Sequence, residues 1–506
     1  MKNITSAIVL ILLLATASLT NAQWSQIGND IDGEAAGDYS GGSVSLSSDG
    51  SIVAIGAPYN DGNGTDAGHV RIYENIGGNW VQLGNDIDGE DAEDESGVSV
   101  NLSSDGSILA IGARENDGNG NSAGHVRIYE FISGNWIQMG SDINGESAGD
   151  DSGFGVSLSS NGSIVAIGAY GNDGNGNNRG SVRAYEYSGG NWTQIGNDID
   201  GEADGDCSCI VSLSSDGSIL AIGAYQSNVN GNESGQVKVF EYNLGNWIQI
   251  GSSIDGEAAE DWSGVSVSLS SNGSIIAIGA PWNDGNDTTD TARGHTRIFE
   301  YIGGNWVQMG SDIDGEEVED MFGFSVNLNS DGTIVAIGAP HYNGIGTDAG
   351  HVSVFGYSMG NWVQIGSVIY GEATGDASFS VNISSDGSIV AIGAPYNCGN
   401  GIEAGHVRVY GNPNVGIKEN TINTEVSIYP NPTTGLITIK NEECRINNAS
   451  VFDIYGKEVF NTDVKSQKTK IKNQKCEIDL SSNAKGIYFI KVTTNKGVAV
   501  KKVVLE

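Results

Sequence analysis

Short apolar runs alternate with clusters of Gly, Asn and Asp along most of this chain. The first complete set holds four runs, at residues 43–48, 51–57, 69–74 and 80–87. Alternating or short continuous apolar residues between turn-forming residues are typical of β-strands. No run has the three- and four-residue spacing of an amphipathic helix. The pattern therefore predicts an all-β protein built from short strands.

This set of strands repeats with a nearly fixed period. Seven tryptophans each begin a Trp-x-Gln-x-Gly strand, with spacings of 56, 56, 56, 55, 59 and 56 residues: Trp24, Trp80, Trp136, Trp192, Trp247, Trp306 and Trp362. Four strands per unit at this period predict a β-propeller in which each unit is one blade. A β-solenoid is the alternative, although its turns are usually shorter, at about 20–30 residues.

A second marker also gives seven blades. Seven Ala-Ile-Gly-Ala stretches end the second strand of each unit, at Ala57, Ala113, Ala169, Ala224, Ala280, Ala339 and Ala394. The two markers are out of phase, because the chain opens with the Trp24 strand and its last unit ends at residues 406–410 without one. In a circular fold, residues 24–31 would complete the last blade. That closure would hide sheet edges that are otherwise exposed.

The repeats resemble the FG-GAP repeat of integrin α-subunit propellers and bacterial surface proteins. The unit that matches best reads Phe-Gly-Phe-Ser-Val at residues 322–326, Ser-Asp-Gly at 330–332, Ile-Gly-Ala-Pro at 337–340 and Gly-His-Val at 350–352. The resemblance covers about residues 24–411 and implies a seven-bladed propeller. Calcium-binding members carry a D-x-D-x-D-G-x-x-D loop between the first two strands. Here a Ser-Asp-Gly-Ser turn replaces it, with too few oxygens for a calcium ion, so that site is not carried over.

The two ends of the chain differ from the repeats. Residues 1–22 have the basic start, short apolar run and small residues of a secretory signal peptide, followed by the propeller at 23–411. Residues 412–424 break the period and are interpreted as a linker. Residues 425–506 hold further β-prone runs, which predict a small Ig-like sandwich. No segment of the mature chain is expected to span a membrane.

Residues 425–506 resemble the C-terminal sorting domain of the type IX secretion system of Bacteroidetes. The motif residues are Pro430, Asn431, Pro432, Gly435, Gly456, Lys457, Gly486 and Tyr488. The resemblance implies a partner, the secretion machinery, and a location, secreted or at the outer cell surface. An ordinary terminal Ig-like domain is the alternative.

Charge divides at the same boundary. The whole chain has a formal net charge of −39, yet residues 413–506 hold 14 basic and 10 acidic residues. The propeller is therefore strongly acidic. This charge argues against nucleic acid or an anionic membrane as a partner, and it favours cations or basic surfaces.

Carboxylates recur in every loop between blades. Each carries Gly-Glu-x-x-x-Asp, as at Glu34 and Asp38, and most add acids just before. One hypothesis is a ring of weak calcium sites, with the candidate ligands Asp30, Asp32, Asp86, Asp88, Asp312 and Asp314. The alternative is that each Asp caps the backbone of a turn, which explains why every blade has it. No other cofactor is indicated.

Two positions in each unit carry candidate chemistry. Five histidines share the first position of the third strand, and the interpretation is strand packing because Ser181 and Gln236 replace them elsewhere. The second position follows Gly-Ala-Pro and changes from blade to blade. Its candidate ligand-binding residues are Tyr59, Glu115, Gln226, Trp282, His341 and Tyr396, with Gly171 in the remaining blade. Exposed aromatic residues suit carbohydrate stacking or protein contacts, and the alternative is that they fill gaps between blades.

The sequence as a whole predicts a secreted or cell-surface binding module that recognises a protein or glycan through its long loops. An enzyme, such as a polysaccharide lyase or hydrolase, is the alternative from another class, and a structural surface-coat component is the third. Catalysis would need one blade to depart from the others with a perturbed acid–base pair. The carboxylates are uniform between blades, so no catalytic residue is assigned.

Overall fold

The computed structural model describes residues 23–174, 176–285, 292–343, 346–412, 426–431, 433–441, 446–453, 458–461, 475–481, 485–494 and 498–505. The predicted signal peptide at 1–22 and all of the predicted linker except Asn412 lie outside these residues. The chain divides into two compact units, residues 1–416 and 417–506. None of the described segments forms a helix long and apolar enough to cross a membrane.

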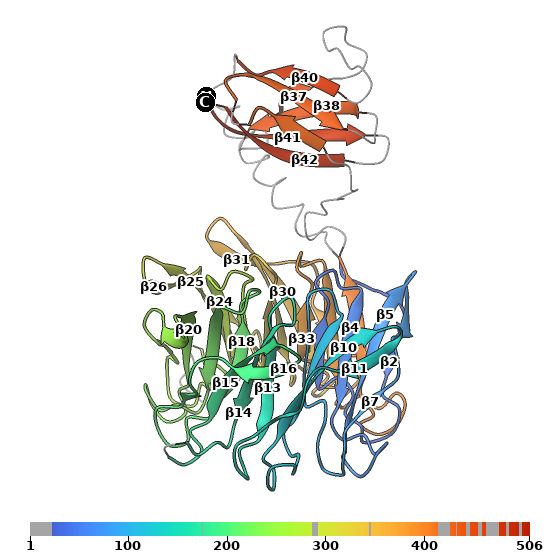
Figure 1. Ribbon diagram of the computed structural model, residues 1–506, viewed down its shortest axis with the longest axis vertical. Helices are drawn as coiled ribbons and strands as arrows, with labels where there is room; N and C mark the ends of the chain where they lie inside the picture. Colours follow the sequence, from blue (N-terminus) through green and yellow to red (C-terminus); the bar gives the residue numbers. More distant parts are fainter. Residues whose placement is uncertain are drawn as a thin grey trace. The chain divides into compact units, whose positions relative to one another are not determined.

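The first unit is a seven-bladed β-propeller, as predicted, and Figure 1 shows its blades side by side. The first strand of each blade lies nearest the axis: β3 (Ser43–Leu46), β8 (Ser99–Leu102), β13 (Ser152–Leu158), β18 (Ser208–Leu213), β23 (Ser266–Leu269), β28 (Ser325–Leu328) and β33 (Ser380–Ile383). The second strands are β4 (Ile52–Ala57), β9 (Ile108–Ala113), β14 (Ile164–Ala169), β19 (Ile219–Ala224), β24 (Ile275–Ala280), β29 (Ile334–Ala339) and β34 (Ile389–Ala394).

The third strands are β5 (His69–Ile76), β10 (His125–Ile132), β15 (Ser181–Ser188), β20 (Gln236–Asn243), β25 (His295–Ile302), β30 (His351–Ser358) and β35 (His406–Gly411). The outer strands are β6 (Asn79–Gln82), β11 (Asn135–Gln138), β16 (Asn191–Gln194), β21 (Asn246–Gln249), β26 (Asn305–Gln308), β31 (Asn361–Gln364) and β1 (Ser25–Gln26). We number the blades 1 to 7 by their first strands, from β3 to β33. All pairings within the blades are antiparallel.

The fourth apolar run of each unit is not the continuous strand that was predicted. In blade 1, residues 80–87 are divided between β6 and a two-residue strand, β7, which pairs separately with the start of β5. Gly84 lies between them with a φ of +82°, a conformation that bends the chain out of the ladder. The equivalent short strands are β12 (Ile143–Asn144), β17 (Ile199–Asp200), β22 (Ile254–Asp255), β27 (Ile313–Asp314), β32 (Ile369–Tyr370) and β2 (Ile31–Asp32).

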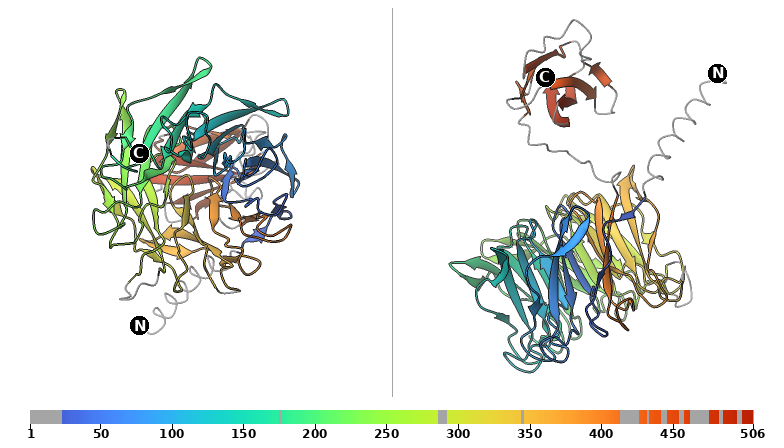
Figure 2. Two further views of the ribbon diagram at one scale, coloured as in Figure 1. Left: turned by 90° about the horizontal axis from the view of Figure 1, so that it is seen from below. Right: turned by 90° about the vertical axis from the view of Figure 1, so that its right-hand side faces the viewer.

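The N-terminal strands complete the last blade. β1 and β2 both pair with β35, so residues near the start and the end of the propeller share one sheet. The left view of Figure 2 shows the ring with the blue start of the chain beside the orange end of the propeller. Trp24 is buried at this junction, and its Nε1 donates to the carbonyl oxygen of Ile365 in blade 6 at 3.0 Å.

The inner turns of all seven blades are joined by a closed circle of backbone hydrogen bonds. The amide of each inner-turn serine donates to the carbonyl oxygen of the next, at 2.8–3.1 Å, in the order Ser48, Ser104, Ser160, Ser215, Ser271, Ser330, Ser385 and back to Ser48. A second circle of hydrogen bonds joins the first strands themselves. There a Ser or Asn side-chain oxygen of one blade accepts the amide of the next at 2.8–3.0 Å, as Ser157 Oγ accepts Leu213 N–H. Both circles satisfy edge-strand amides that face the axis.

The apolar core lies between neighbouring blades. Ile72 of blade 1 and Leu109 and Ile111 of blade 2 belong to one buried cluster. The Ala-Ile-Gly-Ala motif follows from this packing, because a Cβ on Gly56 would lie 2.0 Å from the carbonyl oxygen of Gly97 in the next blade. The repeated tryptophans also link blades, as Trp136 Nε1 donates to the carbonyl oxygen of Leu83 at 2.9 Å.

The second unit has two antiparallel sheets that enclose their own core. One sheet is formed by β36 (Val426–Tyr429), β37 (Leu436–Asn441) and β40 (Lys475–Asp479). The other is formed by β38 (Ile446–Asp453), β39 (Glu458–Asn461), β41 (Gly486–Thr494) and β42 (Val498–Leu505). Ile437 and Ile439 of the first sheet and Val451, Ile490 and Val503 of the second are buried in one cluster.

Deletion of residues 23–32 should destabilise the propeller strongly. It removes β1 and β2, exposes the edge of β35 and takes away the buried Trp24. Loss of a buried tryptophan alone costs about 3–5 kcal/mol. Thermal melts followed by circular dichroism should show a large fall in Tm, whereas Met359→Ala, at a side chain that is 97% exposed, should leave it unchanged. An unaltered Tm for the deletion would rule out closure by these strands.

Ser157→Ala should destabilise the ring from its inside. The change leaves the buried Leu213 amide without its acceptor, and such a loss costs about 1–3 kcal/mol. Ser160→Ala is the matched control, because Ser160 joins the inner circle through its backbone. Denaturant unfolding should separate the two variants by that amount, and equal midpoints would contradict a role for the side-chain circle.

Candidate functional site

The turns of each blade fall on two different faces of the propeller. The short turns, between the first and second and between the third and fourth strands, share one face. The loops after the second strand and between blades share the other, at the lower end of the propeller in Figure 1. We call the latter the long-loop face. Nearly all the variation between repeats is found there, which makes it the candidate site.

The interblade loops are held by carboxylates that recur in every blade. In blade 1, Asp38 is buried, and its Oδ2 accepts the backbone amides of Glu34 at 3.2 Å and Ala35 at 2.9 Å and the side-chain amide of Asn60 at 3.1 Å. The same Asp caps the same turn in every other blade. The capping interpretation of Gly-Glu-x-x-x-Asp is therefore confirmed. These aspartates fix the loops in place.

The loops after the second strand are tied to the interblade loops. Asn63 Nδ2 donates to the carbonyl oxygens of Gly89 at 2.7 Å and Glu90 at 3.0 Å, and Asn119, Asn230 and Asn400 do the same in their blades. Asp61 Oδ1 accepts the amide of Asp66 within the loop. In these four blades the two loops of the long-loop face are thus tied together, and such ties hold loop side chains at fixed positions.

One residue, one to four positions before the first strand, has a left-handed backbone in every blade. Its φ lies between 45° and 55°, and none of the seven residues is glycine: Tyr39, Glu95, Asp151, Cys207, Trp262, Met321 and Ala377. This conformation is unfavourable for a residue with a side chain. The sequence analysis missed this position, although its variation shortly before a constant strand was a visible signal.

This new position contacts the variable position that was predicted. The Tyr39 ring lies 5.0 Å from the Tyr59 ring and 5.2 Å from the Tyr396 ring, between centroids. The Tyr39 hydroxyl donates to Glu403 Oε2 at 2.8 Å, and this bond is the main reason that the pKa of Tyr39 is raised to about 12. Tyr396 is 41% exposed, whereas Tyr59 is half-buried. The three tyrosines form one aromatic cluster at the meeting of blades 7 and 1.

A second aromatic cluster lies across blades 4 and 5. The Trp262 ring is 5.6 Å from that of Trp282 and 5.7 Å from that of Tyr225. Trp262 Nε1 donates to Glu233 Oε2 at 3.0 Å. Trp282 Nε1 is buried and has no hydrogen-bond acceptor among the described residues. Half-buried tryptophans held in a fixed position are common anchors in binding surfaces.

Between these clusters lies a charged group. Arg114 Nε is 2.7 Å from Glu95 Oε2 and 3.7 Å from Glu115 Oε1, and the guanidinium lies over the ring of Phe154. Burial, and then the charge of Glu115, raise the pKa of Asp151 to about 6. Carboxyl groups with a raised pKa are enriched at functional sites.

The remaining predicted residues have local partners. His341 Nδ1 lies 3.0 Å from Asp348 Oδ1, and Gln226 Oε1 accepts the Cys207 thiol at 3.0 Å. Gly171, in the third blade, is buried. The six predicted ligand-binding residues therefore do not converge on one pocket. They form a series of small clusters, and all of these except that of His341 include a residue in the left-handed position.

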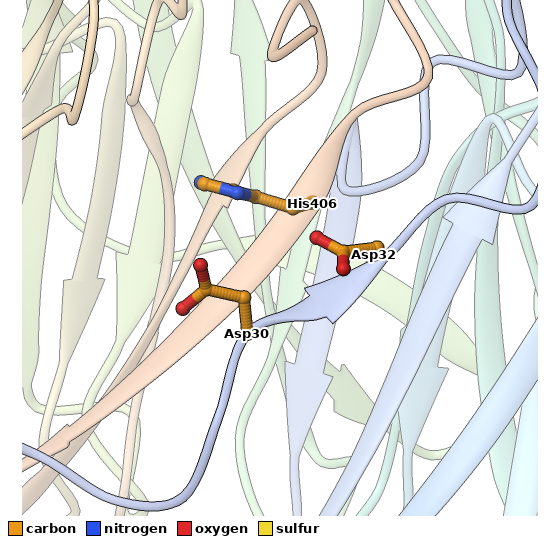
Figure 3. A group of neighbouring side chains, drawn as sticks. All are labelled: Asp30, Asp32 and His406. Carbon is orange, nitrogen blue, oxygen red and sulfur yellow. The ribbon is translucent and has the colours of Figure 1, made fainter. Parts of the chain in front are cut away.

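The six calcium candidates lie on the outer side of this face. Asp30 and Asp32 lie with His406, and Figure 3 shows both carboxylates directed toward the histidine ring. Asp86 lies with Glu34 and His69, and Asp312 with Glu257 and His295, each group having its ligand atoms within 4.8 Å. A fourth group, Glu90, His125 and Asp142, contains none of the six. Asp88 and Asp314 are exposed and join none of the four groups.

These groups differ from the predicted calcium sites in their ligands. Calcium takes six to eight oxygens, whereas an imidazole with two carboxylates suits an ion such as zinc better. Burial lowers the pKa of His69 and of His406, so both rings are neutral near pH 7. However, Arg71 Nη1 lies 3.3 Å from Glu34 Oε1, so that carboxylate already has a cationic partner. Weak calcium binding by the six aspartates stays a prediction.

The described residues of the predicted sorting motif have structural roles. A Cβ on Gly435 would lie 2.6 Å from Ser481 Cβ, which explains the glycine, and the Gly435 amide donates to Thr433 Oγ1 at 3.1 Å. Tyr488 is buried in the core. Pro430 and Asn431 are exposed beside β36, and Gly486 begins β41. Pro432, Gly456 and Lys457 lie outside the described residues.

Two family models match parts of the chain. Residues 427–506 match the secretion system C-terminal sorting domain. Residues 31–73 match the FG-GAP repeat. The sorting domain is that of the type IX system, and it indicates export followed by attachment at the outer cell surface or secretion. Its presence also indicates an interaction with the secretion machinery. The chain is therefore a secreted or cell-surface protein with a propeller fold.

Several solved structures are similar in chain path. Hydrazine synthase from Kuenenia stuttgartiensis matches with 13% identity and a TM-score of 0.45, over 73% of this chain and 94% of that one. A putative 6-phosphogluconolactonase from Bacteroides uniformis matches with 13% identity and a TM-score of 0.46, over 65% and 85%. The WD40 repeats of RRP9 match with 14% identity and a TM-score of 0.47, over 78% and 98%. No curated protein matches the chain.

Asp151→Asn should stabilise the protein in a pH-dependent way. The folded-state pKa, about 6, lies above the ordinary value of 3.8. Between these values the folded state retains a proton that the unfolded chain releases, so stability falls as the pH rises through this range. The amide removes that loss, and it should raise Tm more at about pH 8 than at about pH 4.

The control for this prediction is Asp66→Asn. Asp66 also has a left-handed backbone, with a φ of 52°. The Asp66→Asn variant therefore shows how much of the change in Tm comes from the preference of asparagine for that conformation. An equal change in Tm at both pH values for Asp151→Asn would contradict the raised pKa.

Proposed function

We propose that this protein is a binding module on the outside of the cell that recognises a protein or glycan through the long-loop face. The observation that carries the proposal is the left-handed position before each first strand. All seven blades use this unfavourable conformation, yet the side chain differs in each of them. Strained positions with variable side chains cluster at functional sites. A constant scaffold that presents variable side chains is typical of recognition surfaces.

The chemistry of the face supports this role. The Tyr39 cluster and the Trp262 cluster offer aromatic faces with polar groups beside them, which suits stacking on sugar rings or insertion of a partner's side chain. The net charge of −39 favours a neutral or basic ligand. The interblade aspartates accept backbone hydrogen bonds, so their role is structural. This role supports a binding protein rather than an enzyme.

One observation favours the catalytic alternative. Asp151, with its raised pKa, lies near Glu115 and Arg114, and two carboxyl groups with different pKa values are the usual equipment of a polysaccharide lyase or hydrolase. Arg114 pairs with both Glu95 and Glu115, so these carboxylates already have a cationic partner. We therefore place binding first. Product formation from soluble glycans that is lost in Asp151→Asn would reverse this order.

Variants of the two aromatic clusters test the proposal. A glycan array and an array of extracellular proteins would first identify a ligand for the full chain. Trp262→Ala with Trp282→Ala, and Tyr39→Ala with Tyr396→Ala, should each weaken its binding at least about tenfold, because truncated aromatic anchors cost more than about 1 kcal/mol each. Thermal melts would show that the variants remain folded.

The opposite face supplies the control. Leu244 and Met359 lie in turns between third and fourth strands and are each 97% exposed. Leu244→Ala and Met359→Ala should leave binding unchanged. Binding that is lost in these variants and retained in the aromatic ones would place the ligand on the short-turn face and refute the proposal.

A further inference from the structure

An arginine of the third strand bridges neighbouring blades. In blade 1, Arg71 Nη2 donates to the carbonyl oxygen of Asp32 at 2.7 Å, and Nη1 lies 3.3 Å from Glu34 Oε1. Asp32 and Glu34 both follow the outer strand of the preceding blade. The guanidinium lies over the ring of Tyr73, two residues along the same strand, at 5.7 Å. The carbonyl, the carboxylate and the ring together form a socket for a planar cation.

The same socket recurs around the propeller. Arg183, Arg297 and Arg408 each donate to the equivalent carbonyl oxygen, pair with the equivalent glutamate and lie over the equivalent ring. Arg127 pairs with Glu90 of the preceding blade and with Asp142. In blade 4 a lysine takes this place, and Lys238 Nζ lies 2.6 Å from Glu202 Oε1. Six blades therefore supply their own cation.

Blade 6 has the socket without the cation. Its third strand, β30, carries Ser353 where the other blades carry Arg or Lys. The preceding blade still provides Asp314 and Glu316, and β30 still provides the ring of Phe355. A cavity of about 310 Å³ lies there, lined by Asp314, Glu316, Ser353 and Phe355 together with Asp312, His351 and Trp362.

The charge of this cavity is unbalanced. Its lining includes three carboxylates and no Lys or Arg. Arg293 contacts the neighbouring loop, where its Nη1 donates to the backbone oxygen of Glu316 at 3.0 Å. His351 is 4% exposed, and burial lowers its pKa to about 4, so the ring contributes no positive charge near pH 7. Its buried Nδ1 has no hydrogen-bond partner among the described residues.

We propose that this cavity binds the guanidinium group of an arginine side chain from a partner polypeptide. The guanidinium would take the place that Arg71 fills in blade 1. It would donate to the backbone oxygen of Asp314 and the carboxylate of Glu316 and lie against Phe355. Guanidinium suits this set better than ammonium, because its planar fork bonds two acceptors while stacking on a ring. The cavity is separate from the aromatic clusters, so the proposal stands independently of the proposed function.

Calorimetric titration of the full chain with N-acetyl-arginine methylamide tests this site. One equivalent should bind, and N-acetyl-citrulline methylamide, which is similar in shape but uncharged, should not. Glu316→Gln should weaken binding at least about tenfold, since it removes a charged hydrogen bond. Glu146→Gln is the matched control, because Glu146 belongs to a socket already filled by Arg183. That variant should bind as the wild type does.

Two further variants use the other blades as templates. Ser353→Arg recreates the arrangement of Arg71 and should abolish binding while the protein stays folded. Arg183→Ser should open a second socket and raise the stoichiometry from one to two. Absence of binding at millimolar probe, equal binding of the citrulline probe, or full binding by Ser353→Arg would each overturn the proposal. Displacement of the probe by calcium with no loss in Ser353→Arg would do so as well, and would assign the carboxylates to a metal.

Discussion

A closed circle of seven backbone hydrogen bonds around the axis is the constraint on which the rest of the propeller depends. Each inner-turn serine bonds to the next blade, and the second circle of Ser and Asn side chains satisfies the adjacent amides. The inner-turn backbone therefore follows the same course in every blade. The Asp or Asn of each turn accepts the amide and hydroxyl of the residue two positions later, as Asp49 does from Ser51, which explains the uniform Ser-Asp-Gly or Ser-Asn-Gly turns. Little variation is left around the axis on this face.

The constraint on one face leaves the other free to vary. Capping aspartates such as Asp38 hold the interblade loops, and Asn63 ties them to the adjacent loops. With the backbone fixed in this way, the left-handed position holds a different side chain in each blade. The aromatic cluster of Tyr39 and the charged group around Arg114 differ in chemistry yet occupy equivalent places. The fold therefore keeps the inner turns uniform on one face and varies the side chains on the other.

The sequence predicted the ring because its signals are local and repeated. The tryptophan period and the Ala-Ile-Gly-Ala motif mark strands directly, and their phase difference indicated how the chain closes. The break after β6 was missed because apolar residues occur on both sides of it. The groups of His69, Asp86 and Glu34 were missed for a different reason, since their members come from three segments that meet only across a blade boundary. Tyr39 was missed because a left-handed backbone is usually signalled by glycine.

A residue that differs between blades has one significance at the long-loop face and another at the contacts between blades. At the long-loop face the side chains differ in most blades. A difference there indicates a function only where the chemistry of the side chain suits a ligand. Between blades 5 and 6, the site has Ser353 in place of an arginine, so it keeps its carboxylates without a cation. A buried carboxylate without a partner would be costly. Glu316 is exposed, however, so water can solvate it and the fold does not need the cation. Blade 6 can thus be stable with its socket accessible, which is the condition that a binding site for an external arginine must meet.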